Sequence, residues 1–432
     1  MTKMDNWANG LSEGDVDEIQ HIIDKFQLHS DGVPVQVDNA SDNRKYLFAD
    51  RYLLVRHERL YDVLGVLTDI PEGLRRERPS LMGRGTVAEL SGISAEEVTD
   101  GVVRVEMGHL PHSVQEALDQ VDGKLGEGVA TPDHVITVAP EGSPCAASEP
   151  QEVYSDIGPY PSPHSGSDGT GVNIYIADTG LLPAADVRQH AWLADVDGDK
   201  DPCVPDSGIL QPYYGHGTFA AGVARCMAPK AGVYVANIFS TAGSALESVM
   251  VARLDKALRE RPEPDLVHLS VATPTRKNMH LIAFERWLER LSRTKGTVCV
   301  AAAGNYNTAT RCWPGAFRGV ISVGALDLDW RSRAHYSNSG RWVDVYAPGT
   351  NLINAYTTGD YRCKVAPFKN TMRKFTGLAQ WSGTSFAAPM VTGLIAAQMS
   401  RTGGNAEQAA AAVLAQAQAQ ALPGVGPILL PW

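Results

Sequence analysis

The chain has 432 residues, 44% hydrophobic and 20% charged, which excludes a mostly disordered or fibrous protein. At about 150 residues per domain, this length predicts two or three domains. The formal net charge at pH 7 is −11, from 38 basic and 49 acidic residues. This balance argues against nucleic acid as a partner, because binding it usually needs a basic surface.

The charge is unevenly distributed along the chain. Residues 1–150 carry 13 Lys and Arg against 27 Asp and Glu, a balance of −14, whereas residues 151–432 carry 25 against 22, a balance of +3. The acidic part is either well solvated or docked on a less acidic domain of the same chain, and charge alone leaves both readings open.

The N-terminal sequence MTKMDNWANGLSEGDVDE lacks the basic and apolar regions of a signal peptide, and no segment has eighteen uninterrupted apolar residues. We therefore expect a cytoplasmic protein with no membrane partner. Six scattered cysteines, without a CxxC pair or a histidine at ligand spacing, give a zinc site little support. In the cytoplasm they would be reduced thiols, although their even number leaves disulfides open if the protein is exported by another route.

The first 140 residues predict an arm followed by a small domain. Residues 1–45 are polar apart from one stretch of helical period at Val16–Phe26, so we expect an N-terminal arm or a small helix. Residues 46–140 contain β-type runs separated by helix-compatible segments, which predicts a small α+β domain. The runs are Tyr52–Val55, Val102–Val105 and His134–Val138, and one helical segment is Ser113–Leu125.

The remainder predicts a linker and a larger domain. Residues 141–170 are rich in Ser, Pro and Gly and lack hydrophobic periodicity, which is typical of a linker. In residues 171–432, apolar β-type runs alternate with helical patterns, which predicts an α/β fold with a mainly parallel sheet covered on both faces. The runs are Val172–Ala177, Gly232–Ile238, Leu266–Val271, Thr297–Ala303 and Val320–Val323. In such sheets ligands bind at the carboxyl ends of strands.

Three glycine-flanked segments carry polar residues suited to catalysis. Asp178 ends a buried run in IYIADTG, His216 lies between glycines in GHGTFAAG, and Ser385 begins a predicted helix in GTSFAAP. A carboxylate can orient a histidine, and a helix N-terminus favours negative charge that develops beside a serine. Each segment alone is explained better by local structure, as a turn, a turn histidine or a helix cap.

Together, in the order Asp, His, Ser, the three segments indicate a function more specifically than any one of them does alone. ADTG, YGHGT and SGTSFAAPMVTG resemble the three signatures of the subtilisin-like serine peptidases, in that family's order. The resemblance also covers AAAGN at Ala301–Asn305, SVGA at Ser322–Ala325 and YAPG at Tyr346–Gly349, and spans roughly residues 170–402.

The resemblance implies a serine endopeptidase that acts on proteins or peptides through an acyl-enzyme, without a cofactor. Ser385 would be the nucleophile, His216 the general base and then acid, and Asp178 the group that holds the imidazole tautomer. The Asn305 side chain and the Ser385 backbone N–H would stabilise the oxyanion.

The resemblance also places the primary specificity pocket. Its walls would be Ser270, Val271 and Ala272 on one side and Ala302, Ala303 and Gly304 on the other, with Cys312 near the floor. Ala272 stands where the family commonly has Gly, which should narrow the pocket mouth. Arg311 could reach the floor or point to solvent, and we expect an apolar residue before the scissile bond.

Two departures from the family pattern concern a second histidine and metals. Phe219 stands where these peptidases usually have a second histidine. The family's calcium-binding insertion is absent, because Gly222–Pro229 runs straight through. The acidic run Asp195–Asp201 has an early glycine and no closing glutamate for an EF-hand loop, so we predict a solvated turn and no metal site.

Two alternatives were weighed against an active peptidase. An α/β-hydrolase needs GxSxG and the order Ser, Asp, His, whereas here Ala387 breaks the motif and the serine comes last. An inactive binding module would have lost one of the four active-site residues, and all four are present.

The region 46–140 is similar to the family's inhibitory propeptides, which lay their C-terminal strand through the active cleft. The alternative is a permanent accessory domain that recruits a partner protein, and both readings remain open.

Overall fold

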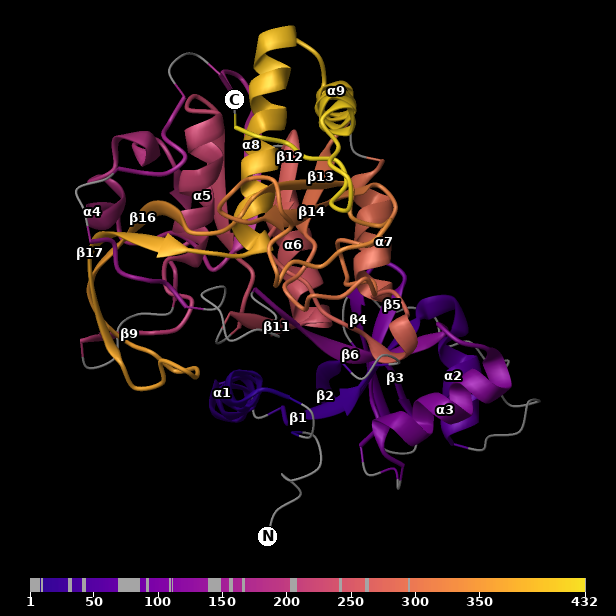
Figure 1. The fold of residues 1–432 in the computed structure, drawn as a ribbon. Helices are drawn as coiled ribbons and strands as arrows, with labels where there is room; N and C mark the ends of the chain where they lie inside the picture. The colour runs from indigo at the N-terminus through magenta and orange to yellow at the C-terminus, as the bar shows by residue number, and fades with distance from the viewer. Residues whose placement is uncertain are drawn as a thin grey trace.

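The computed structural model describes most of the chain. The described residues are 8, 11–29, 33–40, 44–68, 86–90, 93–108, 110, 112–138, 149–154, 158–164, 168–202, 208–240, 243–260, 264–293 and 296–431. Their strands form three sheets, and Figure 1 shows the N-terminal sheet packed below the larger parallel one.

The largest body is built on a parallel sheet of order β15-β14-β13-β12-β7-β10-β8. Its strands are β7 (Asn173–Asp178), β8 (Asp197–Gly198), β10 (Gly232–Asn237), β12 (Leu266–Leu269), β13 (Val298–Ala302), β14 (Val320–Leu326) and β15 (Val345–Pro348). Adjacent strands pair in parallel throughout this sheet. The predicted parallel α/β fold is confirmed.

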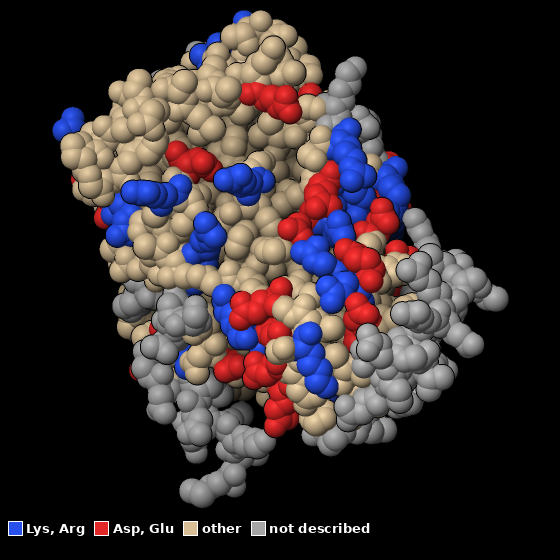
Figure 2. All heavy atoms as spheres, turned by 90° about the vertical axis from the view of Figure 1, so that its right-hand side faces the viewer, with Lys and Arg blue, Asp and Glu red and all other residues tan. Residues whose placement is uncertain are grey.

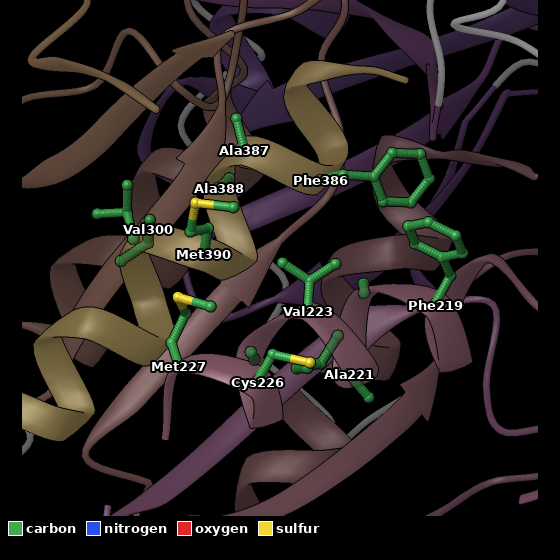
Figure 3. Packing of buried hydrophobic residues seen from close by; sticks show 14 of the residues in the cluster. Phe219, Ala221, Val223, Cys226, Met227, Val300, Phe386, Ala387, Ala388 and Met390 are labelled. Atoms are coloured by element: carbon green, nitrogen blue, oxygen red, sulfur yellow. The ribbon is translucent and has the colours of Figure 1, made fainter. Parts of the chain in front are cut away.

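Helices cover both faces of the parallel sheet. One face packs against α5 (His216–Met227), α8 (Thr384–Thr402) and α9 (Ala406–Ala419), and the other against α6 (Glu247–Glu260) and α7 (Ile282–Leu291). Figure 3 shows apolar side chains of α5 and α8 meeting in the first of these layers. The two helices approach closely because Gly393 faces α5, where a Cβ would lie 2.5 Å from the Ala224 carbonyl oxygen.

The N-terminal sheet is antiparallel and has the order β11-β6-β2-β5-β4-β3, with β1 beside β2. Its strands are β1 (Val35–Asn39), β2 (Lys45–Arg56), β3 (Thr86–Leu90), β4 (Ile93–Thr99), β5 (Val102–Glu106), β6 (Ala130–Thr137) and β11 (Ser244–Leu246). Since β11 comes from the later part of the chain, this sheet joins the N-terminal region to the parallel-sheet body.

Helices also cover the N-terminal sheet, and the α+β region expected there is confirmed. One face carries α2 (Leu60–Leu67) and α3 (Val114–Leu125). The helix α1 (Glu13–His29) shares a separate apolar cluster with residues of β1, β2, β6 and β11. α3 starts at a capping box between Ser113 and Glu116. On the face away from α2 and α3, Leu54 and Ile136 share one apolar cluster with α6 and α7.

A third sheet has the order β17-β16-β9 and consists of β9 (Ile209–Leu210), β16 (Leu352–Arg362) and β17 (Met372–Trp381). Parts of the predicted linker run beside it, since Gln151 bridges Gln380 and Tyr160 bridges Ile353. Short helices occur at α4 (Ala184–Val187) and, as 3-10 turns, at His57–Arg59, Ala191–Leu193 and Arg276–Asn278. The proposed domain limits remain predictions.

Four cysteines of the described residues are buried and form no disulfide, namely Cys226, Cys299, Cys312 and Cys363. Cys145 and Cys203 lie outside the described residues. Among the described helices, none combines the length and apolar character that crossing a bilayer requires.

Candidate active site

Asp178 and His216 meet at the carboxyl edge of the parallel sheet. Asp178 is the last residue of β7 and His216 the first of α5. His216 Nδ1 lies 2.7 Å from Asp178 Oδ1, and both residues are buried. Burial alone would raise the pKa of Asp178, but the adjacent His216 and the hydrogen bonds to the carboxylate lower it. The pair is therefore a carboxylate bound to an imidazole, which fixes the ring and its tautomer.

Ser385 lies in the first turn of α8, beside the loop that follows β13. The Asn305 Oδ1 accepts hydrogen bonds from the Thr384 backbone N–H (3.0 Å) and hydroxyl (2.9 Å). The Gly304 N–H in turn donates to the Thr384 hydroxyl. These bonds tie Asn305 to the N-terminus of α8 and leave Nδ2 as the end of its amide that can serve a ligand.

Asp201 connects, through hydrogen bonds, the two loops that carry Asp178 and His216. Its Oδ2 accepts from the Thr179 hydroxyl and from the Gly215 N–H, both at 2.9 Å, and the Thr179 hydroxyl accepts from the Gly217 N–H. Asp201 is only 5% exposed. The expected solvated turn is therefore wrong at this residue, because Asp201 supports the site. No pattern in the sequence distinguished it from the rest of the acidic run.

The rest of the run, Asp195, Asp197 and Asp199, is exposed. Within the described parts of the chain, no three His, Cys, Asp or Glu side chains are grouped so that they could hold a metal ion.

Aromatic rings pack behind the imidazole. The centroid of the His216 ring lies 4.8 Å from that of the Phe386 ring and 5.2 Å from that of the Trp381 ring. Phe219, at the position of the family's second histidine, lies 4.5 Å from Phe386 and is labelled beside it in Figure 3. This apolar backing restricts the ring to the orientation set by Asp178.

The end of β6 covers Ser385. The Ser385 hydroxyl donates to the Val138 carbonyl oxygen at 2.8 Å, so its proton points toward this segment rather than toward His216. The segment is paired on both sides. The Val138 N–H donates to the Gly243 oxygen, and the Ala272 N–H donates to the Thr137 oxygen.

The predicted pocket walls follow β12 and β13. An ideal Cβ on Gly304 would lie 3.1 Å from the Ala272 methyl, so the two predicted walls approach closely at this level. The Cys312 thiol is buried and accepts from Asn338 and from Arg44, a residue of the N-terminal region. Arg311 is exposed, which decides between the two alternatives for its side chain in favour of solvent.

Comparison with known proteins shows the family of the chain. Residues 169–425, more than half of the chain, match the subtilase family, and the chain belongs to that family. It is 30% identical over 251 residues to the thermophilic serine proteinase of Bacillus sp. (strain AK1), covering 55% of this chain and 54% of that protein. It is 26% identical over 246 residues to subtilisin Savinase of Lederbergia lenta, covering 55% and 79%.

The chain spans about half the length of the first of these curated relatives. Among solved structures, a cold adapted subtilisin-like serine proteinase aligns with a TM-score of 0.48 and 20% identity, covering 62% of this chain and 92% of that one.

Proposed function

We propose that the protein is a serine endopeptidase with Ser385 as nucleophile, His216 as general base and Asp178 as the group that orients His216. The observation that carries the proposal is the 2.7 Å contact between Asp178 and His216 at the sheet edge where α8 presents Ser385. Curated relatives named as serine proteases support it.

The chemistry follows from these positions. The Ser385 oxygen attacks the carbonyl carbon of a peptide bond while its proton passes to His216 Nε2. The negative charge that develops on the carbonyl oxygen is stabilised by Asn305 Nδ2 and the Ser385 N–H, at the positive end of α8. His216 then gives its proton to the leaving amine, the C–N bond breaks, and water releases the acyl group by the reverse sequence.

We further propose that the N-terminal region restrains this site by laying its β6 end across it. The Val138 carbonyl on Ser385 supports the restraint, as does the burial of His216 (1% exposed), Ser385 (2%) and Asn305 (3%). A substrate needs the space beside these three side chains, so the segment must withdraw before peptides can enter.

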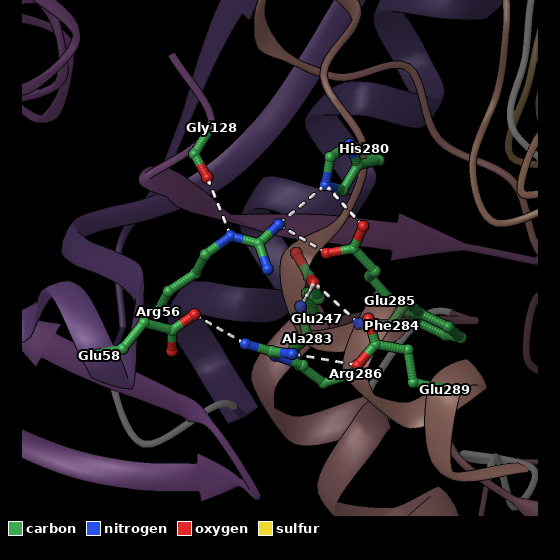
Figure 4. Close-up of polar contacts among 10 residues, drawn as sticks. All are labelled: Arg56, Glu58, Gly128, Glu247, His280, Ala283, Phe284, Glu285, Arg286 and Glu289. Carbon is green, nitrogen blue, oxygen red and sulfur yellow. Dashed lines mark hydrogen bonds and ion pairs between the residues drawn. The ribbon is translucent and has the colours of Figure 1, made fainter. Parts of the chain in front are cut away.

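Charged contacts between the two regions support the docked arrangement over a merely solvated acidic segment. Arg56 lies 2.5 Å from Glu285 and Arg286 lies 2.8 Å from Glu58, and Figure 4 marks both pairs. Hydrogen bonds from His280 and Arg56 lower the pKa of Glu285 to about 2 despite partial burial. Figure 2, viewed onto the side with α7 and the N-terminal sheet, shows basic and acidic side chains interspersed.

For specificity, we propose a small apolar side chain before the scissile bond. The Ala272 methyl narrows the space beside Gly304, where an added Cβ would lie 3.1 Å from it, so a large side chain has less room between these walls. Ala272→Gly should open this space and improve cleavage after Leu or Phe relative to Ala. Unchanged ratios of kcat/KM for these peptides would show that the two walls do not form the pocket.

The activity is tested with a fluorophosphonate probe on the intact protein. Wild-type protein should be labelled at Ser385, and Ser385→Ala and His216→Ala should lose labelling and peptidase activity by several orders of magnitude. Labelling that persists at another residue in Ser385→Ala would overturn the assignment. Mass spectrometry of wild type beside Ser385→Ala distinguishes a removable propeptide, which is cleaved off only in wild type, from a permanent accessory domain, which stays in both.

A further inference from the structure

A buried histidine lies beneath the proposed site and takes no direct part in the chemistry described above. His268 is in β12, between Ile176 of β7 and Val300 of β13, and it is fully buried. Burial lowers its pKa to about 3, so the imidazole is neutral and carries one N–H. Its Nε2 lies 2.7 Å from the Ser270 hydroxyl oxygen.

The Ser270 hydroxyl connects this histidine to Asp178. It is close enough to act as a hydrogen-bond donor that lowers the pKa of the Asp178 carboxyl. In the arrangement seen, however, Asp178 Oδ2 is buried and accepts no hydrogen bond of good geometry from the described residues. A rotation of the hydroxyl about its C–O bond directs its proton toward Asp178, provided that His268 does not require that proton.

The two tautomers of His268 differ in what they leave unpaired. With the proton on Nε2, His268 donates to Ser270, and the Ser270 proton, which in the arrangement seen points to the Ser385 carbonyl oxygen over a long 3.5 Å contact, can turn to Asp178. Only the Nδ1 lone pair then stays without a partner among the described residues. With the proton on Nδ1, Ser270 must donate to Nε2, which leaves both a buried N–H and the carboxylate oxygen unpaired. Since unpaired buried groups destabilise a fold, the first tautomer is favoured.

We propose that His268 is a positioning residue of the peptidase, which acts through Ser270 to direct a hydroxyl proton onto Asp178 and so holds the carboxylate that orients His216. The proposal rests on the proposed triad. The charged or titratable groups that act on His268 are Asp178 at the end of β7 and His216 at the start of α5. Val300 of β13 is apolar, and α8 approaches Ser270 through the Ser385 carbonyl.

The chain offers matched variants for a test. His268→Gln keeps an N–H donor at similar reach, whereas His268→Leu fills the space without one, and Ser270→Ala breaks the next link. Low-field proton NMR of the intact protein reports the proton between His216 and Asp178, and the variant His216→Ala assigns this signal by its loss. We expect the signal to move in His268→Leu and in Ser270→Ala, and to stay near the wild-type position in His268→Gln.

The second readout is the pH profile of fluorophosphonate inactivation in the same intact proteins. In His268→Leu no N–H holds the Ser270 hydroxyl, which is then free to donate to the Ser385 carbonyl oxygen 3.5 Å away instead of to Asp178. The charge of Asp178 is less dispersed without that hydrogen bond, so the midpoint of the inactivation profile should move to higher pH by about 0.5 unit. Adding Ser270→Ala to His268→Leu should give no further shift, because both break one chain of hydrogen bonds.

Two outcomes separate failure of the two proposals. If His268→Leu lowers thermal stability but leaves the NMR signal and the pH midpoint unchanged, His268 is only a core residue and this inference fails. If His216→Ala removes no low-field signal and Ser385 is labelled neither in wild type nor in Asp122→Asn, a variant that breaks the ion pair of the N-terminal region with Arg276 and so loosens the cover of the site, the triad itself fails. Should His268→Leu not fold, Ser270→Ala alone decides, since an unchanged signal and midpoint there would also overturn the inference.

Discussion

Asp122 offers a direct test of the proposed restraint. This side chain of α3 is 5% exposed and lies 2.7 Å from Arg276 and 2.8 Å from Lys277, both in the segment that follows β12. Asp122→Asn keeps the shape but removes the charge, leaving Arg276 paired with Asp119, which is 67% exposed. Breaking a buried pair costs about 3–5 kcal/mol, and the exposed partner offsets about 0–1 kcal/mol.

Because Arg276 and Lys277 keep other partners, we take the lower limit of about 3 kcal/mol, which is about 100-fold in the docking equilibrium. The intact Asp122→Asn protein should therefore hydrolyse a chromogenic peptide up to about 100-fold faster than wild type. The matched control is Asp119→Asn, whose exposed carboxylate contacts the same arginine and which should change the rate less than about fivefold.

Circular dichroism and thermal melting must show that both variants are folded. If folded Asp122→Asn is no faster than Asp119→Asn, the N-terminal region does not limit access to Ser385. The accessory-domain alternative would then be favoured.

Three further predictions follow from the site and its surroundings. Asn305→Ala should lower kcat by about 10²–10³-fold with little change in KM, because its donor serves a charge present only in the transition state; a change confined to KM would exclude this role. EDTA should scarcely change the melting temperature, because we expect no tightly bound ion whose removal would destabilise the folded state. A fall of many degrees in EDTA would reveal a metal site that the sequence analysis missed. Burial and the charge of Asp133 raise the pKa of Glu247 from 4.5 to about 8, so the folded state holds a proton that the unfolded state releases. Stability should fall as the pH rises toward about 8. The lowered pKa of His134, about 3 against 6.5, opposes this only below pH 6.5. Urea unfolding between pH 6.5 and 8 should show the fall in wild type and a flatter profile in Glu247→Gln; equal profiles would contradict the assignment.

The sequence predicted most strands of the parallel sheet and missed the short β8 and β15 as well as the β16 and β17 hairpin. Every residue of β13 and β14 is buried, and such runs are recognised by composition alone. In the β16 and β17 hairpin the alternation that marks a strand is broken, because residues 354–357 are buried in succession and Gly359 and Gly377 interrupt the two strands. β11 has three residues and is a strand because β6 lies beside it, so its signal is tertiary.

The same distinction holds for the candidate site. Asp178, His216 and Ser385 could be singled out because each lies in a glycine-flanked motif of a known pattern. Asp201 could not, since its partners Thr179 and Gly215 are brought to it by the fold. His268 could not either, because its contact with the nearby Ser270 gains meaning only from the adjacent strand β7, which ends at Asp178. The contact of Val138 with Ser385 joins residues 247 positions apart, and only the resemblance to propeptides suggested it.

The N-terminal region also completes hydrogen bonds that the parallel-sheet body needs. The fully buried Asp133 of β6 accepts from the backbone N–H and hydroxyl of Ser248 in the first turn of α6. The carboxyl group of Glu247, the first residue of α6, caps a different helix, because its Oε1 accepts from the N–H groups of Ala283 and Phe284 at the start of α7. Withdrawing β6 completely would therefore expose an uncapped helix end and the apolar cluster that Ile136 shares with α6 and α7. If the β6 end restrains the site as proposed, a local release of Thr137 and Val138 would uncover Ser385 without either loss. Partial displacement of β6 is therefore the form of activation that this proposal favours over loss of the whole region.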